Sequence, residues 1–192
     1  MIRIAILASG NGSNAQRIIE YFADNKDILF PFVITNKEDS YVRKRAESMG
    51  IPSIYISNSE LKKGGSLLNL LIENKIDWVI LAGYLLLIPS NVIKAFSNKI
   101  INIHPALLPK YGGKGMYGMK VHEAVIANSE KESGITIHFV NENYDEGDII
   151  IQAKCSISDD DNPEILSQKI HFLEHEFFPK VIEDLILKNI NL

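Results

Sequence analysis

The chain has 192 residues, 46% of them hydrophobic and 23% charged, with a formal net charge of −4. This length is enough for one globular domain whose apolar core needs no disulfide or structural metal. Because Cys155 is the single cysteine, disulfide frameworks and multi-cysteine zinc sites are excluded, and a reducing cytoplasm is the expected location. No segment approaches the ~18 uninterrupted apolar residues of a membrane span. A balance of 24 acidic against 20 basic residues argues against bulk binding of nucleic acid.

Short β-branched runs alternate with longer amphipathic stretches, which is the pattern of βαβ units. The predicted strands are, in chain order, Ile2–Leu7, Leu29–Thr35, Pro52–Ile56, Trp78–Leu81, Ile100–Ile103, Ile135–Val140 and Ile149–Ile157. The predicted helices are Asn14–Ala23, Tyr41–Met49, Leu67–Asn74, Asn91–Phe96, Val121–Asn128 and Glu164–Lys188. The first and fourth strands are apolar at almost every position, as expected for parallel strands covered on both faces. The sequence therefore predicts a doubly wound α/β fold with a mostly parallel sheet.

The last two predicted strands are separated only by Asn141–Asp148. This connection is too short for a parallel crossover, which takes about a dozen residues, so the C-terminal strand is expected to be antiparallel. The run Lys62–Gly65 indicates a surface break and not a linker. Residues 1–192 are therefore expected to form a single domain.

The segment Ser9–Ala15 directly follows the first strand and opens the first helix. Its glycines permit a tight turn, and the free N–H groups at a helix start can hold a phosphate. The spacing also satisfies the G-x-G-x-x-G/A pattern of dinucleotide sites, a weak signal when it stands alone. An acidic residue is absent from the end of the second strand, where the chain has Thr35-Asn36-Lys37. The alternative is a plain strand-to-helix turn capped by Ser13 or Asn14.

Two polar side chains, Asn102 and His104, end the fifth predicted strand. Residues two apart on a strand point to the same side, so an amide donor and an imidazole project together at the edge where α/β folds bind ligands. This pair suits a substrate carbonyl that becomes negatively charged during a reaction. The alternative is a turn asparagine beside a capping histidine.

The acidic loop after the strand that contains His138 offers Asp145 and Asp148 as partners for His104. A carboxylate beside His104 would orient the ring and favour the imidazolium by charge attraction. The alternative is that these carboxylates are only solvated.

A glycine-rich stretch over residues 108–120 carries Lys110, Lys114 and Lys120. A flexible basic loop is typical of a lid over an anionic substrate, and disorder without function is the alternative.

Together these motifs resemble the folate-dependent phosphoribosylglycinamide formyltransferases, and the resemblance covers essentially the whole chain. The matching segments are 8–14, 34–37, 81–84, 101–111, 134–140 and 147–152. The central Asn-x-His-Pro-x-Leu-Leu-Pro signature is shared by enzymes that use formyltetrahydrofolate. The N-terminal glycine loop points to the ribonucleotide substrate. At 192 residues, we expect the chain to lack the extra domain of related formyltransferases and hydrolases.

The resemblance implies a Rossmann-like formyltransferase fold and transfer of a formyl group from 10-formyltetrahydrofolate to the amine of glycinamide ribonucleotide, without a metal. The implied catalytic residues are Asn102, His104 and Asp145. The implied ribonucleotide contacts are Gly12, Ser13, Asn14 and Glu174. The implied folate contacts are Leu85, Leu86, Leu87, Ile88, Asn102, Asn141, Glu142, Asn143, Tyr144 and Asp145. The family often has Met-Arg-Ile where this chain has Leu85-Leu86-Leu87, so the side chain of that arginine has no counterpart here.

Two other functions remain open on these residues. One is hydrolysis of formyltetrahydrofolate, in which water replaces the amine. The other is a dinucleotide-binding or ligand-sensing module that uses only the glycine loop. The expected partners are the two small-molecule substrates, without nucleic acid or membrane, and the expected assembly is a monomer or a weak homodimer.

Overall fold

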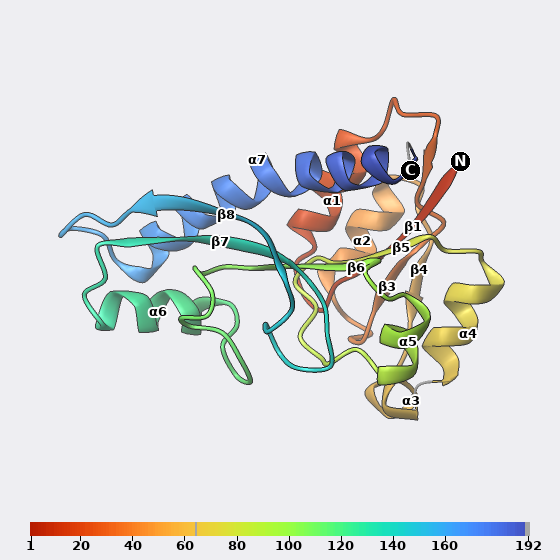
Figure 1. The fold of residues 1–192 in the computed structure, drawn as a ribbon, viewed down its shortest axis with the longest axis horizontal. Helices are drawn as coiled ribbons and strands as arrows, with labels where there is room; N and C mark the ends of the chain where they lie inside the picture. The colour runs from red at the N-terminus through yellow and green to blue at the C-terminus, as the bar shows by residue number, and fades with distance from the viewer. Residues whose placement is uncertain (64, 191–192) are drawn as a thin grey trace.

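The computed structural model describes residues 1–63 and 65–190, apart from the side chains of 187–190, and arranges them around one eight-stranded sheet (Figure 1). The strands are β1 (Ile2–Leu7), β2 (Ile28–Leu29), β3 (Val33–Thr35), β4 (Ser53–Tyr55), β5 (Trp78–Leu81), β6 (Ile100–His104), β7 (Glu132–Phe139) and β8 (Ile149–Ser156). The helices are α1 (Ser13–Tyr21), α2 (Tyr41–Ser48), α3 (Asn58–Lys63), α4 (Gly65–Glu73), α5 (Ser90–Ala95), α6 (Met119–Ala127) and α7 (Pro163–Ile190).

The strand order β4-β3-β1-β5-β6-β7-β8 is that of a doubly wound sheet extended at one side, with β2 paired to β1. All pairings from β4 to β6 are parallel, while β6–β7 and β7–β8 are antiparallel. The predicted mostly parallel sheet and its antiparallel C-terminal pair are thus confirmed. The chain passes to β3 on one side of β1 and later to β5 on the other, so a crevice opens at the carboxyl ends of β1 and β5.

Apart from shifts of one to three residues at the ends of elements, the structure differs from the predicted elements in two places. The strand expected over Leu29–Thr35 is divided into β2 and β3, because Pro31 lies between them and lacks the N–H that a continuous ladder requires. Helix α3 was not expected from the apolar pattern. It starts with a capping box, in which Glu60 N–H donates to Ser57 Oγ over 3.3 Å and Ser57 N–H donates to Glu60 Oε2 over 3.0 Å.

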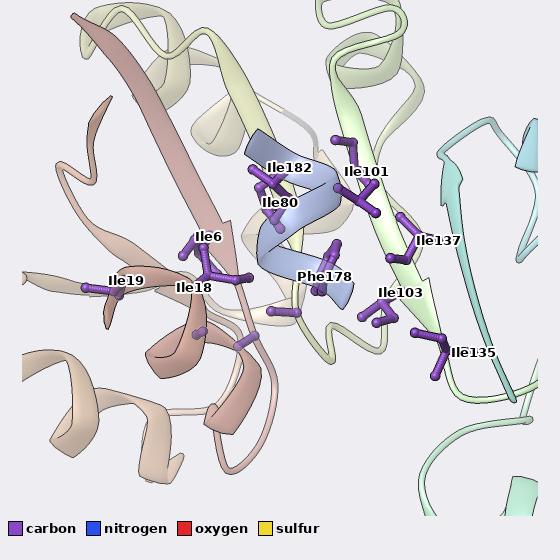
Figure 2. Packing of buried hydrophobic residues seen from close by; sticks show 14 of the residues in the cluster. Ile6, Ile18, Ile19, Ile80, Ile101, Ile103, Ile135, Ile137, Phe178 and Ile182 are labelled. Atoms are coloured by element: carbon purple, nitrogen blue, oxygen red, sulfur yellow. The ribbon is translucent and has the colours of Figure 1, made fainter. Parts of the chain in front are cut away.

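Two apolar clusters sandwich the sheet. Alternate residues of β1 separate cleanly, with Ile4 and Ile6 packing on the side of α1, α2, α6 and α7, and Ala5 and Leu7 on the side of α3, α4 and α5. Figure 2 shows Phe178 of α7, which is fully buried, against isoleucines of the central strands. Of the helices in residues 1–63 and 65–190, none is long and apolar enough to cross a membrane.

Because Phe178 joins the longest helix to the sheet, F178A is expected to lower the free energy of unfolding by about 3–5 kcal/mol. The matched control is F172A on the same helix, since Phe172 is 68% exposed and its loss should change stability by no more than ~0.5 kcal/mol. Urea unfolding of both variants measures the difference. Equal effects from the two substitutions would contradict this packing.

Candidate active site

A cavity of about 620 Å³ lies at the carboxyl ends of β1, β5 and β6. Its wall is formed by residues 9–14, 82–85, 102–105 and 113–119, together with Lys37, His122, Tyr144, Asp145 and four residues of α7. The loops after β1 and β5 are tied together here, because Ser9 N–H donates to Gly83 O over 3.0 Å and Leu85 N–H donates to Ser9 Oγ over 3.0 Å. The cavity therefore occupies the switch point of the sheet.

Asn102 and His104 both reach this cavity from the end of β6. The antiparallel register pairs Asn102 with His138 and His104 with Thr136 on β7. Residues directly opposite each other on antiparallel strands share one face of the sheet. The side chains of Asn102, His104 and His138 therefore lie on the same side. Asn102 Nδ2 lies 3.1 Å from His138 Nε2.

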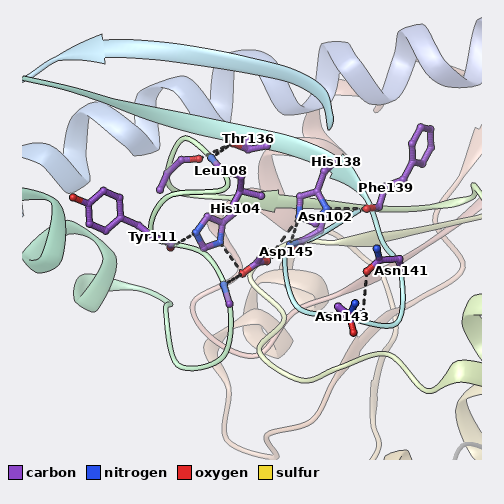
Figure 3. Close-up of polar contacts among 12 residues, drawn as sticks. Asn102, His104, Leu108, Tyr111, Thr136, His138, Phe139, Asn141, Asn143 and Asp145 are labelled. Carbon is purple, nitrogen blue, oxygen red and sulfur yellow. Dashed lines mark hydrogen bonds and ion pairs between the residues drawn. The ribbon is translucent and has the colours of Figure 1, made fainter. Parts of the chain in front are cut away.

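Asp145 enters this group from the loop between β7 and β8 (Figure 3). Its Oδ2 lies 3.5 Å from His104 Nδ1 and accepts the Gly113 N–H over 2.9 Å, while Oδ1 lies 3.5 Å from Asn102 Nδ2. Asp145 has a left-handed backbone with φ of 57°, a conformation that Asp and Asn tolerate better than most residues. Asp148 is exposed and does not line the cavity, so of the two carboxylates only Asp145 meets His104.

The other ring nitrogen of His104 is held by the main chain. His104 Nε2 lies 2.8 Å from Tyr111 O, and because a carbonyl only accepts, Nε2 carries a proton that it donates. The other ring nitrogen, Nδ1, is the one that faces Asp145. The turn between His104 and Tyr111 is supported by Thr136, whose Oγ1 donates to Ala106 O over 2.7 Å.

His138 is held as a neutral ring. Its Nδ1 donates to Phe139 O over 2.8 Å, which leaves Nε2 as an acceptor for the amide of Asn102. Burial lowers the pKa of His138, although the Phe139 carbonyl and the charge of Asp145 act in the opposite direction. The consequence is that the nitrogen of the Asn102 amide, and not its oxygen, is turned toward His138.

The glycine loop forms the opposite end of the cavity. Gly12, with φ of 79°, is the N-cap of α1, and no side chain caps this helix. The alternative of a plain turn capped by Ser13 or Asn14 is therefore wrong, since both lie inside the first turn of α1. The first N–H groups of a helix lack intrahelical acceptors, so an uncapped turn on a cavity wall offers donors to an anion.

Glu174 of α7 is buried beside this loop. Its Oε2 accepts from Asn14 Nδ2 over 2.9 Å and lies 2.7 Å from His171 Nδ1. The hydrogen bond to Glu174 raises the pKa of His171 against the opposing effect of burial. Asn14 Oδ1 is buried without a hydrogen-bond partner in the described part of the chain. The Nδ2 group of Asn14 thus donates to Glu174, while its Oδ1 remains an available acceptor.

The structure places some of the residues expected to bind folate on the cavity wall and others away from it. Those on the cavity wall are Leu85, Asn102, Tyr144 and Asp145. Those that do not line it are Leu86, Leu87, Ile88, Asn141, Glu142 and Asn143. Ile88 is buried in the apolar cluster beneath the loop.

Of the three lysines expected over the site, only Lys114 lines the cavity. Lys110 instead forms a 2.8 Å ion pair with Glu130, and Lys120 lies 5.0 Å above the Tyr117 ring. Lys110 and Lys120 therefore do not line the cavity over which the basic loop was expected to lie. Lys37, which follows β3, lines the cavity instead. Within the described residues, no group of three His, Cys, Asp or Glu side chains is arranged to hold a metal ion.

Sequence reasoning missed several groups of this site: His138, His122, Lys37 and the backbone of Tyr111 and Gly113. Lys37 follows a strand and could have been found by the same positional argument as Asn102. The roles of the Tyr111 carbonyl and the Gly113 N–H leave no trace in residue type, because every residue has a carbonyl and nearly all have an N–H.

The histidines are expected to titrate separately. By NMR, His138 and His122 should have pKa values below the usual 6.5, because burial disfavours their charged forms, and His171 should lie above it. The ion pair of His171 then stabilises the fold below pH 6.5, and this contribution disappears as the pH rises through the raised pKa. E174Q should return the His171 pKa toward its usual value. A shared midpoint near 6.5 for all three rings would disprove this arrangement.

Comparison with known proteins gives a consistent result. A sequence model described as formyl transferase matches residues 2–182. A Bacillus subtilis protein named phosphoribosylglycinamide formyltransferase is 35% identical over 191 residues, which are 97% of this chain and 95% of the relative. A chloroplastic phosphoribosylglycinamide formyltransferase of Arabidopsis thaliana is 40% identical over 188 residues, 94% of this chain and 64% of the relative. The chain thus spans less than two thirds of the plant relatives that it matches.

Solved structures agree with the sequence relatives. The phosphoribosylglycinamide formyltransferase of Bacillus halodurans has a TM-score of 0.88 at 34% identity, covering 99% of this chain and 98% of that chain. The enzyme of the same name from Streptococcus pneumoniae TIGR4 has a TM-score of 0.86 at 34% identity, covering 97% and 99%. Both the sequence match over residues 2–182 and these structures lead to one conclusion: the chain belongs to the formyl transferase family.

Proposed function

We propose that this chain transfers the formyl group of 10-formyltetrahydrofolate to the amine of 5-phosphoribosylglycinamide, as one formyltransferase domain. The observation that carries the proposal is the meeting of Asn102, His104 and Asp145 on one wall of a cavity whose other end is an uncapped helix start. The three side chains suit acyl transfer, and the helix start suits binding of a phosphate. The names of the relatives from Bacillus subtilis and Arabidopsis thaliana support formyl transfer to phosphoribosylglycinamide.

In the proposed reaction the amine attacks the formyl carbon, and the carbonyl oxygen becomes an oxyanion. Asn102 and His104 supply its hydrogen-bond donors. Their short contacts, to His138 and to Tyr111 O, fix how the two side chains are turned. Their long contacts, both of 3.5 Å to Asp145, are weak, so one N–H of Asn102 and the Nδ1 side of His104 remain available to the substrate oxygen. One such donor contributes roughly 2.7–4 kcal/mol to transition-state stabilisation.

Asp145 has two roles in the proposal. Its carboxylate lies beside His104 Nδ1 and helps to orient the ring that donates a hydrogen bond to the oxyanion. Its carboxylate also orients a water that carries the proton away from the attacking amine. That proton passes to the folate nitrogen as the C–N bond to the folate breaks, and the formyl group remains on the glycinamide nitrogen.

The ribonucleotide is proposed to lie across the α1 end of the cavity. The backbone N–H groups of Gly12, Ser13 and Asn14 would hold its phosphate, as anions bind at helix starts. Oε2 of Glu174 is engaged by Asn14 and His171, which leaves Oε1 to accept from a substrate hydroxyl. The unpartnered Asn14 Oδ1 would accept a further substrate donor.

The folate is proposed to occupy the Leu85, Tyr144 and Asp145 side, which brings its formyl group to Asn102. Binding both substrates side by side makes the reaction effectively intramolecular, an advantage on the order of 7–11 kcal/mol. The single, half-buried and free thiol of Cys155 fits a reducing compartment such as the cytoplasm.

Release of tetrahydrofolate is expected to require glycinamide ribonucleotide, because the amine and not water is the nucleophile. A spectrophotometric assay with 10-formyltetrahydrofolate, with and without the ribonucleotide, tests this. Formyl release at the same rate without it would establish hydrolysis instead. In a thermal-shift panel, stabilisation by NADP but not by a folate analogue would show a nucleotide module.

D145N is expected to lower kcat by about 10²- to 10⁴-fold with little change in KM, because it removes the charge but not the shape. Asparagine also tolerates the left-handed backbone at this position, so the fold should be retained. D148N is the matched control, since Asp148 lies on the same loop but outside the cavity, and should keep normal kcat. Normal turnover of D145N with a defect in D148N would reverse the two assignments.

A further inference from the structure

We propose that Arg45 is a positioning residue for the phosphate end of the site: it fixes the glycine loop so that the loop presents donors, and not acceptors, to an anion. The inference rests on the proposed function, because it takes the segment Gly12–Asn14 to bind the substrate phosphate. Arg45 lies on α2 and is absent from the cavity wall. Any effect on substrate therefore passes through the residues that it holds.

Arg45 makes a fork of contacts to Asn11, the residue just before the helix cap. Its Nε donates to Asn11 O over 3.0 Å and to Asn11 Oδ1 over 2.9 Å, and its Nη2 donates to Asn11 Oδ1 over 2.6 Å. Its Nη1 donates to Oε1 of Gln16, in the first turns of α1. One guanidinium thus connects the loop before the anion-binding turn to the helix after it.

The choice of Asn11 atoms explains what this fork does. Both contacted atoms of Asn11 are oxygens with partial negative charge, and Asn11 itself lines the cavity. An oxygen turned toward a phosphate would repel it, whereas an oxygen bound to a guanidinium is turned to Arg45 and its charge is compensated. The N–H groups of the loop then face the anion without a competing acceptor.

The rest of α2 holds the same loop in place. Val42 N–H donates to Gly10 O over 3.2 Å, and a Cβ on Gly12 would lie 2.3 Å from Val42 Cγ2, so the helix is packed directly against the turn. The Arg45 guanidinium also lies 5.0 Å from the centre of the Tyr41 ring. Stacking on an aromatic face limits the freedom of the guanidinium and keeps the fork preorganised.

The test compares R45Q and R45K with the unaltered chain. Calorimetry measures Kd for 5-phosphoribosylglycinamide and for its riboside, which lacks the 5-phosphate. In R45Q the preference for the phosphorylated ligand should fall about tenfold, and the steady-state KM for the ribonucleotide should rise similarly with kcat and the folate KM unchanged. R45K keeps the charge but lacks the planar fork, so it should lose most of the same preference.

R43Q is the matched control. Arg43 lies on the same helix, but its side chain donates to Glu38 O and Ser53 Oγ, away from the glycine loop. It should leave the phosphate preference unchanged. Because the preference is a ratio measured on the same folded protein, a lower melting temperature of R45Q does not alter it.

An unchanged ratio in R45Q, with a clear phosphate preference in the unaltered chain, would overturn the role of Arg45 alone. Equal binding of riboside and ribonucleotide by the unaltered chain would overturn both this inference and the placement of the phosphate. A parallel loss for both ligands, or a fall in kcat alone, would show that Arg45 is merely structural and would also overturn the inference.

Discussion

The antiparallel register of β6 against β7 is the constraint on which the site depends. It sets His138 opposite Asn102, and the short β7–β8 connection then returns Asp145 to the same place. The connection is tight at Gly147, where a Cβ would lie only 1.7 Å from Phe139 O. A shift of one residue in this register would turn His138 to the other face of the sheet and leave the Asn102 amide without its acceptor.

The parallel and antiparallel parts of the sheet supply different halves of the chemistry. In the parallel half, β1 is followed by the start of α1, whose free backbone N–H groups are donors with partial positive charge. The antiparallel half provides titratable side chains, because β7 and its loop run back along the edge of β6. Helix α7 contacts both halves, reaching α1 through Glu174 and packing Phe178 against the sheet. An overall charge of −4 is compatible with anionic ligands since the attraction is local.

The sequence predicted the structure well where the type of a side chain and its position on a strand together determine where the side chain points. The alternation of short β-branched runs with amphipathic stretches predicted the sheet. The two-residue spacing of Asn102 and His104 predicted a shared face, which follows from strand geometry. Charge alone did not say where a lysine points, so Lys110 was expected over the site although Glu130 holds it elsewhere. The choice between Asp145 and Asp148 depends on the path of a loop whose left-handed residue no composition rule predicts.

Two of the contacts that hold the catalytic candidates come from main-chain atoms, the Tyr111 carbonyl on His104 and the Gly113 N–H on Asp145. Replacing the side chain at either position leaves the interacting atom in place. Substitution of Tyr111 therefore tests its hydroxyl bond to Glu130 and not its carbonyl, and a side chain at Gly113, where φ is 92°, strains the backbone without removing the N–H. Backbone chemistry, such as an ester in place of the amide at Gly113, addresses these contacts, since it removes the donor and keeps every side chain.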